Sequence, residues 1–286
     1  MKKVLLRAPL LTNSGYGIHS RQLFSWLYER KDVDLTVECL QWGRTSWILD
    51  ENQENGIFKK IMKCSKQIEG KFDISFQVQL PDEWDTNLAY KNIGVTAVVE
   101  TDKCNPAWID CCNKMDHIVV PSTFTKNVLV RSGHLMRKVT VIPEWYNEYA
   151  TNKSLLAKIQ ADERYKKIKK GFNVLLIGTL TSGIASDDRK NLNNTIKWLC
   201  KEFKDDENVG IILKTNFGKG TSEDRQMCSD YLKDVLSEHR KESQYPTFYF
   251  LHGNMKKEEV AALMDLDKIK LYVSATRGEG YGLPLI

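Results

Sequence analysis

The stretch R-G-E-G-Y-G-L-P at 277–284 combines one acid with closely spaced glycines. The residues that could form a site there are Gly278, Glu279, Gly280, Tyr281, Gly282 and Leu283. Glycines let backbone amides approach a ligand closely, and the Glu279 carboxylate can accept hydrogen bonds from hydroxyl groups. The apolar run 268–274 just before it reads as a buried strand. Because open α/β sheets bind ligands at the carboxyl ends of their strands, the stretch predicts a ligand-binding loop.

A second glycine-rich stretch, N-S-G-Y-G-I-H-S at 13–20, follows the first apolar run of the chain. Gly15 and Gly17 permit a close backbone approach, and the helix expected after them offers its positive end to a phosphate or sugar oxygen. The spacing approximates G-x-G-x-x-G with Ser20 in the last place, and Glu38 lies where a dinucleotide fold places its ribose-binding acid. A nicotinamide-dependent oxidoreductase is therefore one alternative. A plain tight turn is another, because the third glycine is absent and the loop is long.

Three further side chains stand where they could reach a ligand. His19 begins the first helix, where it could reach a bound ligand, with an ordinary surface histidine as the alternative. Lys214 and His252 each lie at the end of a predicted strand. Both could reach a bound ligand from there, with a structural lysine as the alternative for Lys214.

No metal site is predicted from the acidic residues or the cysteines. The adjacent acids Asp187-Asp188 and Asp205-Asp206 are interpreted as solvated loop acids. The seven cysteines are odd in number and form no C-x-x-C motif, so neither a disulfide framework nor a zinc site is indicated. Reduced thiols indicate a cytoplasmic protein.

Composition and length narrow the class of protein. The chain has 286 residues, of which 42 % are hydrophobic, and this favours two domains. A net charge of +5, spread along the chain, argues weakly for anionic ligands and against a nucleic-acid binder. The N-terminal apolar run is interrupted by Arg7 and Pro9, so it is not read as a signal peptide, and no run is long enough for a membrane span.

Short apolar runs alternate with amphipathic stretches, which is typical of βαβ units and a mostly parallel sheet. In the first half the expected strands are 2–8, 34–40, 72–78, 92–99, 117–122 and 138–143, and the expected helices are 18–30, 57–64, 106–115 and 123–133. In the second half the expected strands are 172–178, 209–215, 247–253 and 268–274, and the expected helices are 192–203, 225–239 and 256–266.

A strongly charged stretch separates the two halves. We predict a first domain at 1–150, a solvated linker helix at 151–171 and a second domain at 172–286. The linker carries a lysine cluster, Lys166, Lys167, Lys169 and Lys170. A weak peripheral contact with acidic lipid is an alternative role for these lysines.

The ordered series of motifs resembles one known family. E-G-Y-G-L-P-L-I at 279–286 is similar to the E-G-F-G-L-P-x-x-E signature of the retaining, family-4 type (group 1) glycosyltransferases. The resemblance extends through V-V-P-S-T-F-T-K-N-V-L-V-R-S-G (119–133), K-V-T-V-I-P-E (138–144), V-L-L-I-G (174–178) and D-R-K-N (188–191). It implies the α/β GT-B fold, in which two Rossmann-like domains with mostly parallel sheets face each other across a cleft.

The resemblance also implies a reaction. Sugar would pass, with retention, from a nucleoside-diphosphate sugar to a carbohydrate or other hydroxyl-bearing acceptor, without a metal ion or other cofactor. Such a reaction needs a diphosphate held by amides and cations and an oxocarbenium-like transition state. The first domain would be the acceptor side and the second the donor side.

Individual roles follow from the same resemblance. Lys190 would neutralise the diphosphate leaving group, and Glu279 would bind hydroxyls of the donor sugar. The backbone of Gly280–Leu283, which includes Tyr281, would cradle phosphate. Gly15 and Gly17 would approach the donor diphosphate and the acceptor. Lys214 and His252 would lie near the bound donor, and His19 would lie on the acceptor side.

The sequence departs from the family pattern at three places. Glu100 stands where many members have a histidine near the reacting sugar, and we expect Glu100 or Asp102 to contact the acceptor. Thr179 replaces an arginine of many relatives. The second glutamate of the signature would be residue 287, so we expect a truncated, incomplete second domain. A non-catalytic sugar- or nucleotide-binding relative is therefore a further alternative.

Overall fold

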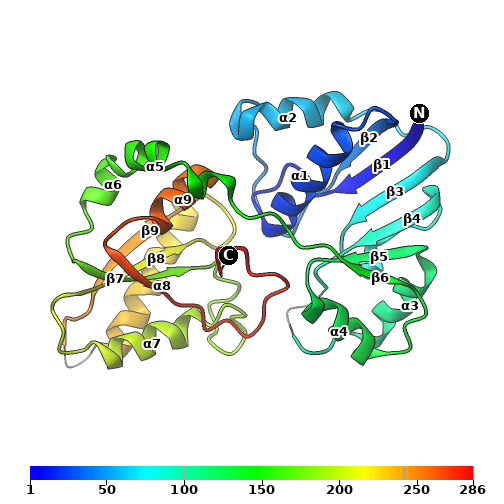
Figure 1. Ribbon diagram of the computed structural model, residues 1–286. Coiled ribbons are helices and arrows are strands. Elements are labelled where there is room, and N and C mark those ends of the chain that lie inside the picture. Colours follow the sequence, from blue (N-terminus) through cyan, green and yellow to red (C-terminus); the bar gives the residue numbers. More distant parts are fainter. Residues whose placement is uncertain (99–100, 241–242, 286) are drawn as a thin grey trace. The chain divides into compact units, whose positions relative to one another are not determined.

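A computed structural model of the chain describes residues 1–98, 101–240 and 243–285 (Figure 1). The chain divides into two compact units. The first consists of Met1–Tyr146 together with Gly278–Ile286, and the second of Asn147–Arg277. No helix among the described residues is long and apolar enough to cross a membrane.

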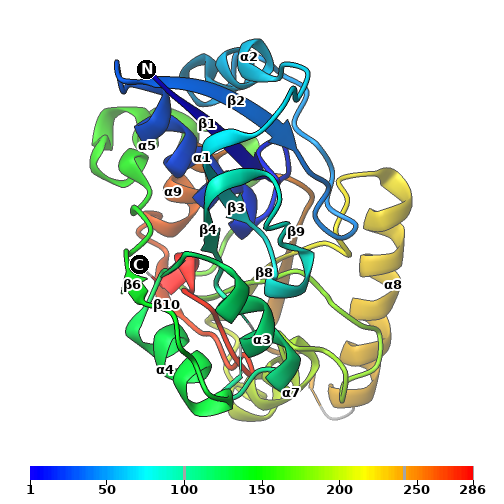
Figure 2. The same ribbon diagram turned by 90° about the vertical axis from the view of Figure 1, so that its right-hand side faces the viewer.

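The first unit is built on a six-stranded parallel sheet with the strand order β2-β1-β3-β4-β5-β6. Its strands are β1 (Lys2–Ala8), β2 (Val33–Cys39), β3 (Phe72–Val78), β4 (Ala89–Val95), β5 (His117–Val120) and β6 (Val139–Val141). Strands β1, β3 and β4 run side by side (Figures 1 and 2). Alternate apolar residues of the strands face the helices, which is why these runs form half-buried or fully buried strands.

In the described part of this unit the sheet is covered by the α-helices α1 (Gly15–Tyr28), α2 (Gln53–Cys64), α3 (Pro106–Lys114) and α4 (Thr123–Ser132). Helices α1 and α2 share one apolar core with β1 and β2, through residues such as Phe24 and Phe58. Helices α3 and α4 pack with β5 through Ile109 and Leu129. Short 3₁₀ turns lie at Pro81–Glu83 and at Leu283–Leu285.

The second unit is built on a four-stranded parallel sheet with the order β10-β7-β8-β9. Its strands are β7 (Phe172–Ile177), β8 (Val209–Thr215), β9 (Thr247–His252) and β10 (Ile269–Tyr272). Helices α7 (Leu192–Glu202) and α8 (Ser222–His239) pack on the face of Val174. On the face of Leu175 lie α5 (Lys153–Gln160), α6 (Glu163–Lys166) and α9 (Lys257–Met264), after a 3₁₀ turn at Glu148–Thr151 (Figure 1).

The α/β class and the parallel sheets agree with the sequence prediction, and most elements begin and end within three residues of their predicted bounds. Ser122 caps α4 as expected, because its hydroxyl accepts a hydrogen bond from the Thr125 N–H at 3.1 Å. The prediction for 268–274 was wrong in one respect. Strand β10 lies at the edge of its sheet, and Leu271 on it is 46 % exposed.

The charged stretch 151–171 is also not the solvated linker helix that we predicted. It forms the two short helices α5 and α6, and Leu156, Tyr165 and Ile168 are buried in the core of the second unit. Its apolar residues are few but fall on one side, so they suffice to attach the stretch to α9 and the sheet.

The compact units differ from the predicted domain boundaries at the C-terminal end. We predicted residues 172–286 as one domain, whereas the segment from Gly278 onward groups with the first unit.

Candidate functional site

The glycine-containing first turn of α1 is closely packed on one side and open on the other. Ser14 is the N-cap, and its hydroxyl accepts a hydrogen bond from the Gly17 N–H at 2.9 Å. A Cβ on Gly17 would lie 2.2 Å from the Thr12 carbonyl oxygen, so only glycine fits there. A Cβ on Gly15 would meet no atom within 4 Å. Gly17 therefore has a steric role, while Gly15 leaves open space at the start of the helix.

Arg21 holds the same turn from inside the core. Its Nη1 donates to the carbonyl oxygens of Leu10 and Thr12 at 2.9 and 3.1 Å, and its side chain is 2 % exposed. The charge is balanced by Glu54 at 3.0 Å. Glu54 has a φ of +47°, and Asn55 and Gly56 after it also have positive φ. Glu54, whose carboxylate pairs with Arg21, therefore lies in a strained stretch of backbone.

His19 and Glu144 form a buried pair in the first unit. His19 Nδ1 lies 3.7 Å from Glu144 Oε1, and the two side chains are 11 % and 6 % exposed. The alternative of a surface histidine is therefore wrong. Burial lowers the pKa of His19 to about 4 and raises the pKa of Glu144 to about 8, so both groups are uncharged near neutral pH.

From Gly278 onward, the acid-bearing loop belongs to the first unit. The Gly280 carbonyl accepts hydrogen bonds from the Ser122 and Thr125 hydroxyls at 3.3 and 3.2 Å. The Tyr281 hydroxyl donates to the Glu144 carbonyl at 2.9 Å. A Cβ on Gly280 would lie 2.7 Å from Ala97 Cβ, so the glycine permits this close approach.

This arrangement divides the predicted donor-binding residues between the two units. Glu279, Gly280, Tyr281, Gly282 and Leu283 belong to the first unit, as do Gly15 and Gly17. Lys190, Lys214 and His252 belong to the second. Asp102 is exposed on the first unit, and Glu100 lies outside the described residues.

In the second unit, Lys190 is held at the carboxyl end of β7. A Cβ on Gly178 would lie 3.4 Å from Lys190 Cγ, so the lysine stem packs over this glycine. Gly178 in turn donates its N–H to the Lys214 carbonyl at 3.1 Å. Lys190 thus lies at the carboxyl end of the sheet, where Rossmann-type folds bind their ligands.

Asp188 fixes the segment that carries Lys190, and our interpretation of it as a solvated acid was wrong. It is fully buried, and its carboxylate accepts hydrogen bonds from the N–H groups of Lys190 and Leu192 at 3.2 and 2.8 Å. It also accepts from the Thr181 hydroxyl at 2.9 Å. Asp188 therefore closes the loop and accepts the first N–H of α7, at Leu192, ahead of the N-cap residue Asn191.

Lys214 does not share a face with Lys190. Strand alternation places its side chain on the side of Ile212, which packs with α9, whereas the Lys190 segment leads into α7. Burial lowers the pKa of Lys214. Lys190 and Lys214 therefore both lie at the carboxyl end of the sheet, but on opposite faces of it.

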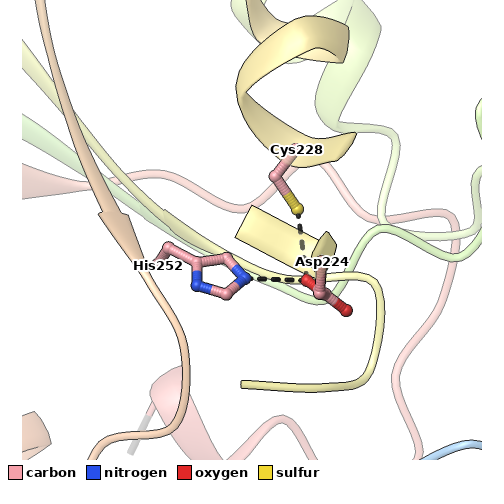
Figure 3. Close-up of side chains that lie close together, drawn as sticks. All are labelled: Asp224, Cys228 and His252. Atoms are coloured by element: carbon pink, nitrogen blue, oxygen red, sulfur yellow. Dashed lines mark hydrogen bonds and ion pairs between the residues drawn. The ribbon is translucent and has the colours of Figure 1, made fainter. Parts of the chain in front are cut away.

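His252 is part of a buried hydrogen-bond group at the end of β9 (Figure 3). Its Nε2 lies 2.8 Å from Asp224 Oδ1, and the Cys228 thiol donates to the same oxygen at 3.5 Å. Asp224 also accepts from the N–H groups of Phe217 and Lys219, each at 3.0 Å. Burial opposes ionisation of Asp224, but the hydrogen bond from His252 and these other bonds outweigh it and lower its pKa.

Asp224, Cys228 and His252 are also the candidate for a metal centre among the described residues, because their ligand atoms lie within 4.8 Å of one another. In the structure the Asp224 oxygen lies between the other two groups and accepts from both, so hydrogen bonds already satisfy the cluster (Figure 3). Burial and Asp224 raise the pKa of the Cys228 thiol to about 12, and a protonated thiol is a poor metal ligand.

Several residues of these sites were missed from the sequence. Asp224 lies just before the predicted helix 225–239 and gave no signal, and Arg21 looked like any helical arginine. Glu144 was seen within a motif but without a role. Its position directly after the apolar run 138–143 could have suggested a buried carboxyl group at a strand end.

The sequence has no match among known protein families or curated proteins. Solved structures do match. The UDP-forming α,α-trehalose-phosphate synthase from Burkholderia xenovorans, in complex with glucose-6-phosphate, has a TM-score of 0.58 and 8 % identity, over 99 % of this chain and 81 % of that one. HepE of Anabaena in complex with UDP-glucose has a TM-score of 0.56 and 10 % identity, over 96 % and 74 % of the two chains.

These similarities define the fold. Together with the two parallel α/β units, they show that the chain has the GT-B fold, as the sequence predicted. An E. coli trehalose-6-phosphate structure bound with UDP-2-fluoro glucose agrees, with a TM-score of 0.51 and 8 % identity over 97 % and 79 % of the chains.

Proposed function

We propose that this chain is a retaining glycosyltransferase, which moves a hexose-like sugar from a nucleoside-diphosphate sugar to a hydroxyl-bearing acceptor. The proposal requires neither a metal ion nor another cofactor. The second unit would bind the donor, and the first unit would bind the acceptor. The solved structures with the same fold include HepE in complex with UDP-glucose, which supports a nucleotide sugar as the donor.

The observation that carries the proposal is the position of Lys190. Its stem packs over Gly178 at the carboxyl end of β7, and Asp188 fixes the backbone on both sides of it. A cation in a preformed position there can stabilise the negative charge that develops on a departing diphosphate. Because the loop is already ordered by Asp188, little reorganisation is needed at the moment of transfer.

The proposed mechanism needs no protein group as the general base. The leaving phosphate would accept the proton of the acceptor hydroxyl as that hydroxyl attacks from the same face of the sugar. The His19–Glu144 pair would then serve the acceptor side as uncharged hydrogen-bonding groups, since burial keeps both neutral.

Thermal unfolding of the chain in the presence of UDP-glucose, GDP-glucose, ADP-glucose and NAD(H) tests the proposal. One sugar nucleotide should raise Tm and the others should not, because a ligand at a hundred times its Kd stabilises the folded state by about 2.7 kcal/mol. Stabilisation by NAD(H) alone would instead favour the oxidoreductase suggested by Gly15, Gly17 and Glu38. In the structure Glu38 is 3.0 Å from Arg7, so its carboxylate is already engaged in an ion pair.

Release of the nucleoside diphosphate in the presence of candidate acceptors separates a transferase from a binding protein. Sugar-nucleotide binding without any diphosphate release, across sugars and acceptors of several classes, would support the non-catalytic alternative. The anomeric configuration of the product, determined by NMR, then decides between retention and inversion.

A further inference from the structure

The second unit carries a groove of about 420 Å³ along strand β9. Its lining residues come from α6 and the segment after it, from the first turn of α8, and from β9 with the loop that follows. At one end the groove reaches His252, which is a predicted donor-binding residue. From there it extends back along the strand to Phe248, so most of it lies away from the carboxyl end of the sheet.

Strand β9 is the edge of its sheet. In the described part of the chain it pairs with β8 on one side and with no strand on the other. All six residues of Thr247–His252 are partly exposed, whereas β7 and β8 are mostly buried. In a parallel strand alternate residues direct both their N–H and C=O groups to the same side. The open side of β9 therefore offers a row of backbone donors and acceptors.

The groove follows this open edge and not one face of the sheet. Phe248 and Phe250 pack with the α7 and α8 side, while Tyr249 and Leu251 pack with the α5, α6 and α9 side. Residues of both sets line the groove, and Tyr165 and Ile168 form part of one of its walls. The Tyr249 hydroxyl accepts hydrogen bonds from the Lys169 and Lys170 N–H groups and so fixes the segment after Ile168 against β9.

The charge around the groove has one sign. Arg164, Lys167 and Arg225 line it, and no aspartate or glutamate is found among its described lining residues. Arg164 is neutralised by Asp162 and Glu259 at 3.1 and 2.7 Å. For Lys167 and Arg225 no ion pair occurs within the described ranges, and the Arg225 guanidinium lies 5.9 Å from the centre of the Phe250 ring. Lys167 and Arg225 are thus two cations, on opposite walls of the groove, that are available to a ligand.

We propose that this groove binds an extended, acidic peptide segment of a partner protein, which adds to β9 as a further strand. The backbone edge would supply hydrogen bonds, Phe248 and Phe250 an apolar contact, and Lys167 and Arg225 the preference for acidic side chains. A second copy of this chain would present the same positive edge and would be repelled. The proposal is independent of the transfer reaction.

Two labelled octapeptides test this inference by fluorescence anisotropy with the whole chain. One alternates Glu and Val and the other alternates Lys and Val, so β-strand propensity is similar and the charge is opposite. We expect the acidic peptide to bind at least tenfold more tightly. On binding, the amides of 247–252 should exchange hydrogen more slowly, which is measured without altering the protein.

Backbone methylation distinguishes strand addition from simple attraction of charge. The acidic peptide is N-methylated at its odd residues in one version and at its even residues in another. Strand addition requires that one version and not the other loses at least tenfold in affinity, because alternate amides face the protein. If both versions bind like the parent peptide, the cations merely attract charge or guard the edge against aggregation, and the proposal is overturned.

The double variant Lys167→Glu/Arg225→Glu should reverse the preference to the basic peptide. Lys197→Glu/Lys201→Glu makes the same change in charge at exposed positions of α7, outside the groove, and should leave the preference unchanged. Failure of the acidic peptide to bind the unaltered chain, or an equal effect of both double variants, contradicts the proposal.

Discussion

Arg21 and Glu54 form a double ion pair beneath the glycine turn of the first unit. Arg21 Nε lies 3.1 Å from Glu54 Oε2, and Arg21 Nη2 lies 3.0 Å from Glu54 Oε1. Burial lowers the pKa of Arg21, and the charge of Glu54 acts in the opposite direction. The pair connects α1 with α2, while the remaining nitrogen of the guanidinium fixes the carbonyls of Leu10 and Thr12.

Replacement of Arg21 by Met should lower the free energy of unfolding by about 3–5 kcal/mol, because it removes the buried guanidinium that pairs with Glu54 and donates to the Leu10 and Thr12 carbonyls. Denaturant unfolding measures this loss. Arg30→Met is the matched control, since Arg30 pairs with Asp32 on the surface and its loss should change little. Similar losses for the two variants would contradict a structural role for the buried pair.

Gly17 and Gly15 allow a comparison within one turn. Gly17→Ala places a methyl group 2.2 Å from the Thr12 carbonyl oxygen, and we expect a loss of about 1–3 kcal/mol in stability. Gly15→Ala enters open space and should be neutral or slightly stabilising. Urea unfolding of both variants provides the test, and equal values would show that the turn relaxes around the added methyl group.

Stability should depend on pH through the His19–Glu144 pair. The pKa of Glu144 rises from 4.5 to about 8 on folding, so its contribution is present at low pH and is lost as pH rises through 8. The pKa of His19 falls from 6.5 to about 4, so its contribution is present above pH 6.5 and is lost as pH falls.

The two effects oppose each other between pH 4.5 and 6.5, and above pH 6.5 only Glu144 acts. We therefore expect the unfolding free energy to fall by about 1–2 kcal/mol between pH 6.5 and 8. Glu144→Gln should remove this fall, as it cannot ionise. If the unfolding free energy falls equally between pH 6.5 and 8 in Glu144→Gln and in the parent chain, another group causes the fall.

Lys190→Ala should reduce sugar transfer by a factor of about 100 to 1000 with little change in stability, because the charge matters most when the diphosphate departs. The rate of nucleoside diphosphate release measures this effect. Lys197→Ala, at an exposed position in α7, is the control. An unchanged rate for Lys190→Ala would remove this lysine from the mechanism.

Asp188→Asn should weaken both the fold and the placement of Lys190. The amide has the size of the carboxylate, but only one of its two terminal atoms can accept hydrogen bonds. We therefore expect the free energy of unfolding to fall by about 1–3 kcal/mol and hydrogen exchange at the start of α7 to become faster. Asp187→Asn is the neighbouring control, since Asp187 is exposed. Equal exchange in the two variants would show that Asp188 does not hold the first N–H of α7.

The alternation of strands and helices could be predicted because each parallel strand is a short apolar run and each helix has one apolar side. The start of α4 at Ser122 and the end of β8 at Thr215 follow from local chemistry alone. The GT-B fold followed from the order of the motifs, since no single motif is specific to it.

What could not be predicted depends on contacts between residues far apart in sequence. Asp188 looks like its neighbour Asp187, and only the packing of the 181–192 loop makes one buried and the other exposed. The burial of His19 likewise depends on Glu144, far along the chain. The attachment of Gly280 to α4 depends on hydroxyl groups that are common at helix starts and carry no distinguishing pattern.

The assignment of the 278–285 segment to the first unit has a consequence for how the chain acquires its structure during synthesis. Ser122 and Gly280 are separated by 158 positions, so the first unit emerges from the ribosome long before the residues that complete it. Closing so long a loop is entropically costly and slow compared with local contacts. A fragment that ends at Tyr146 should therefore unfold at a lower urea concentration than the same unit within the whole chain.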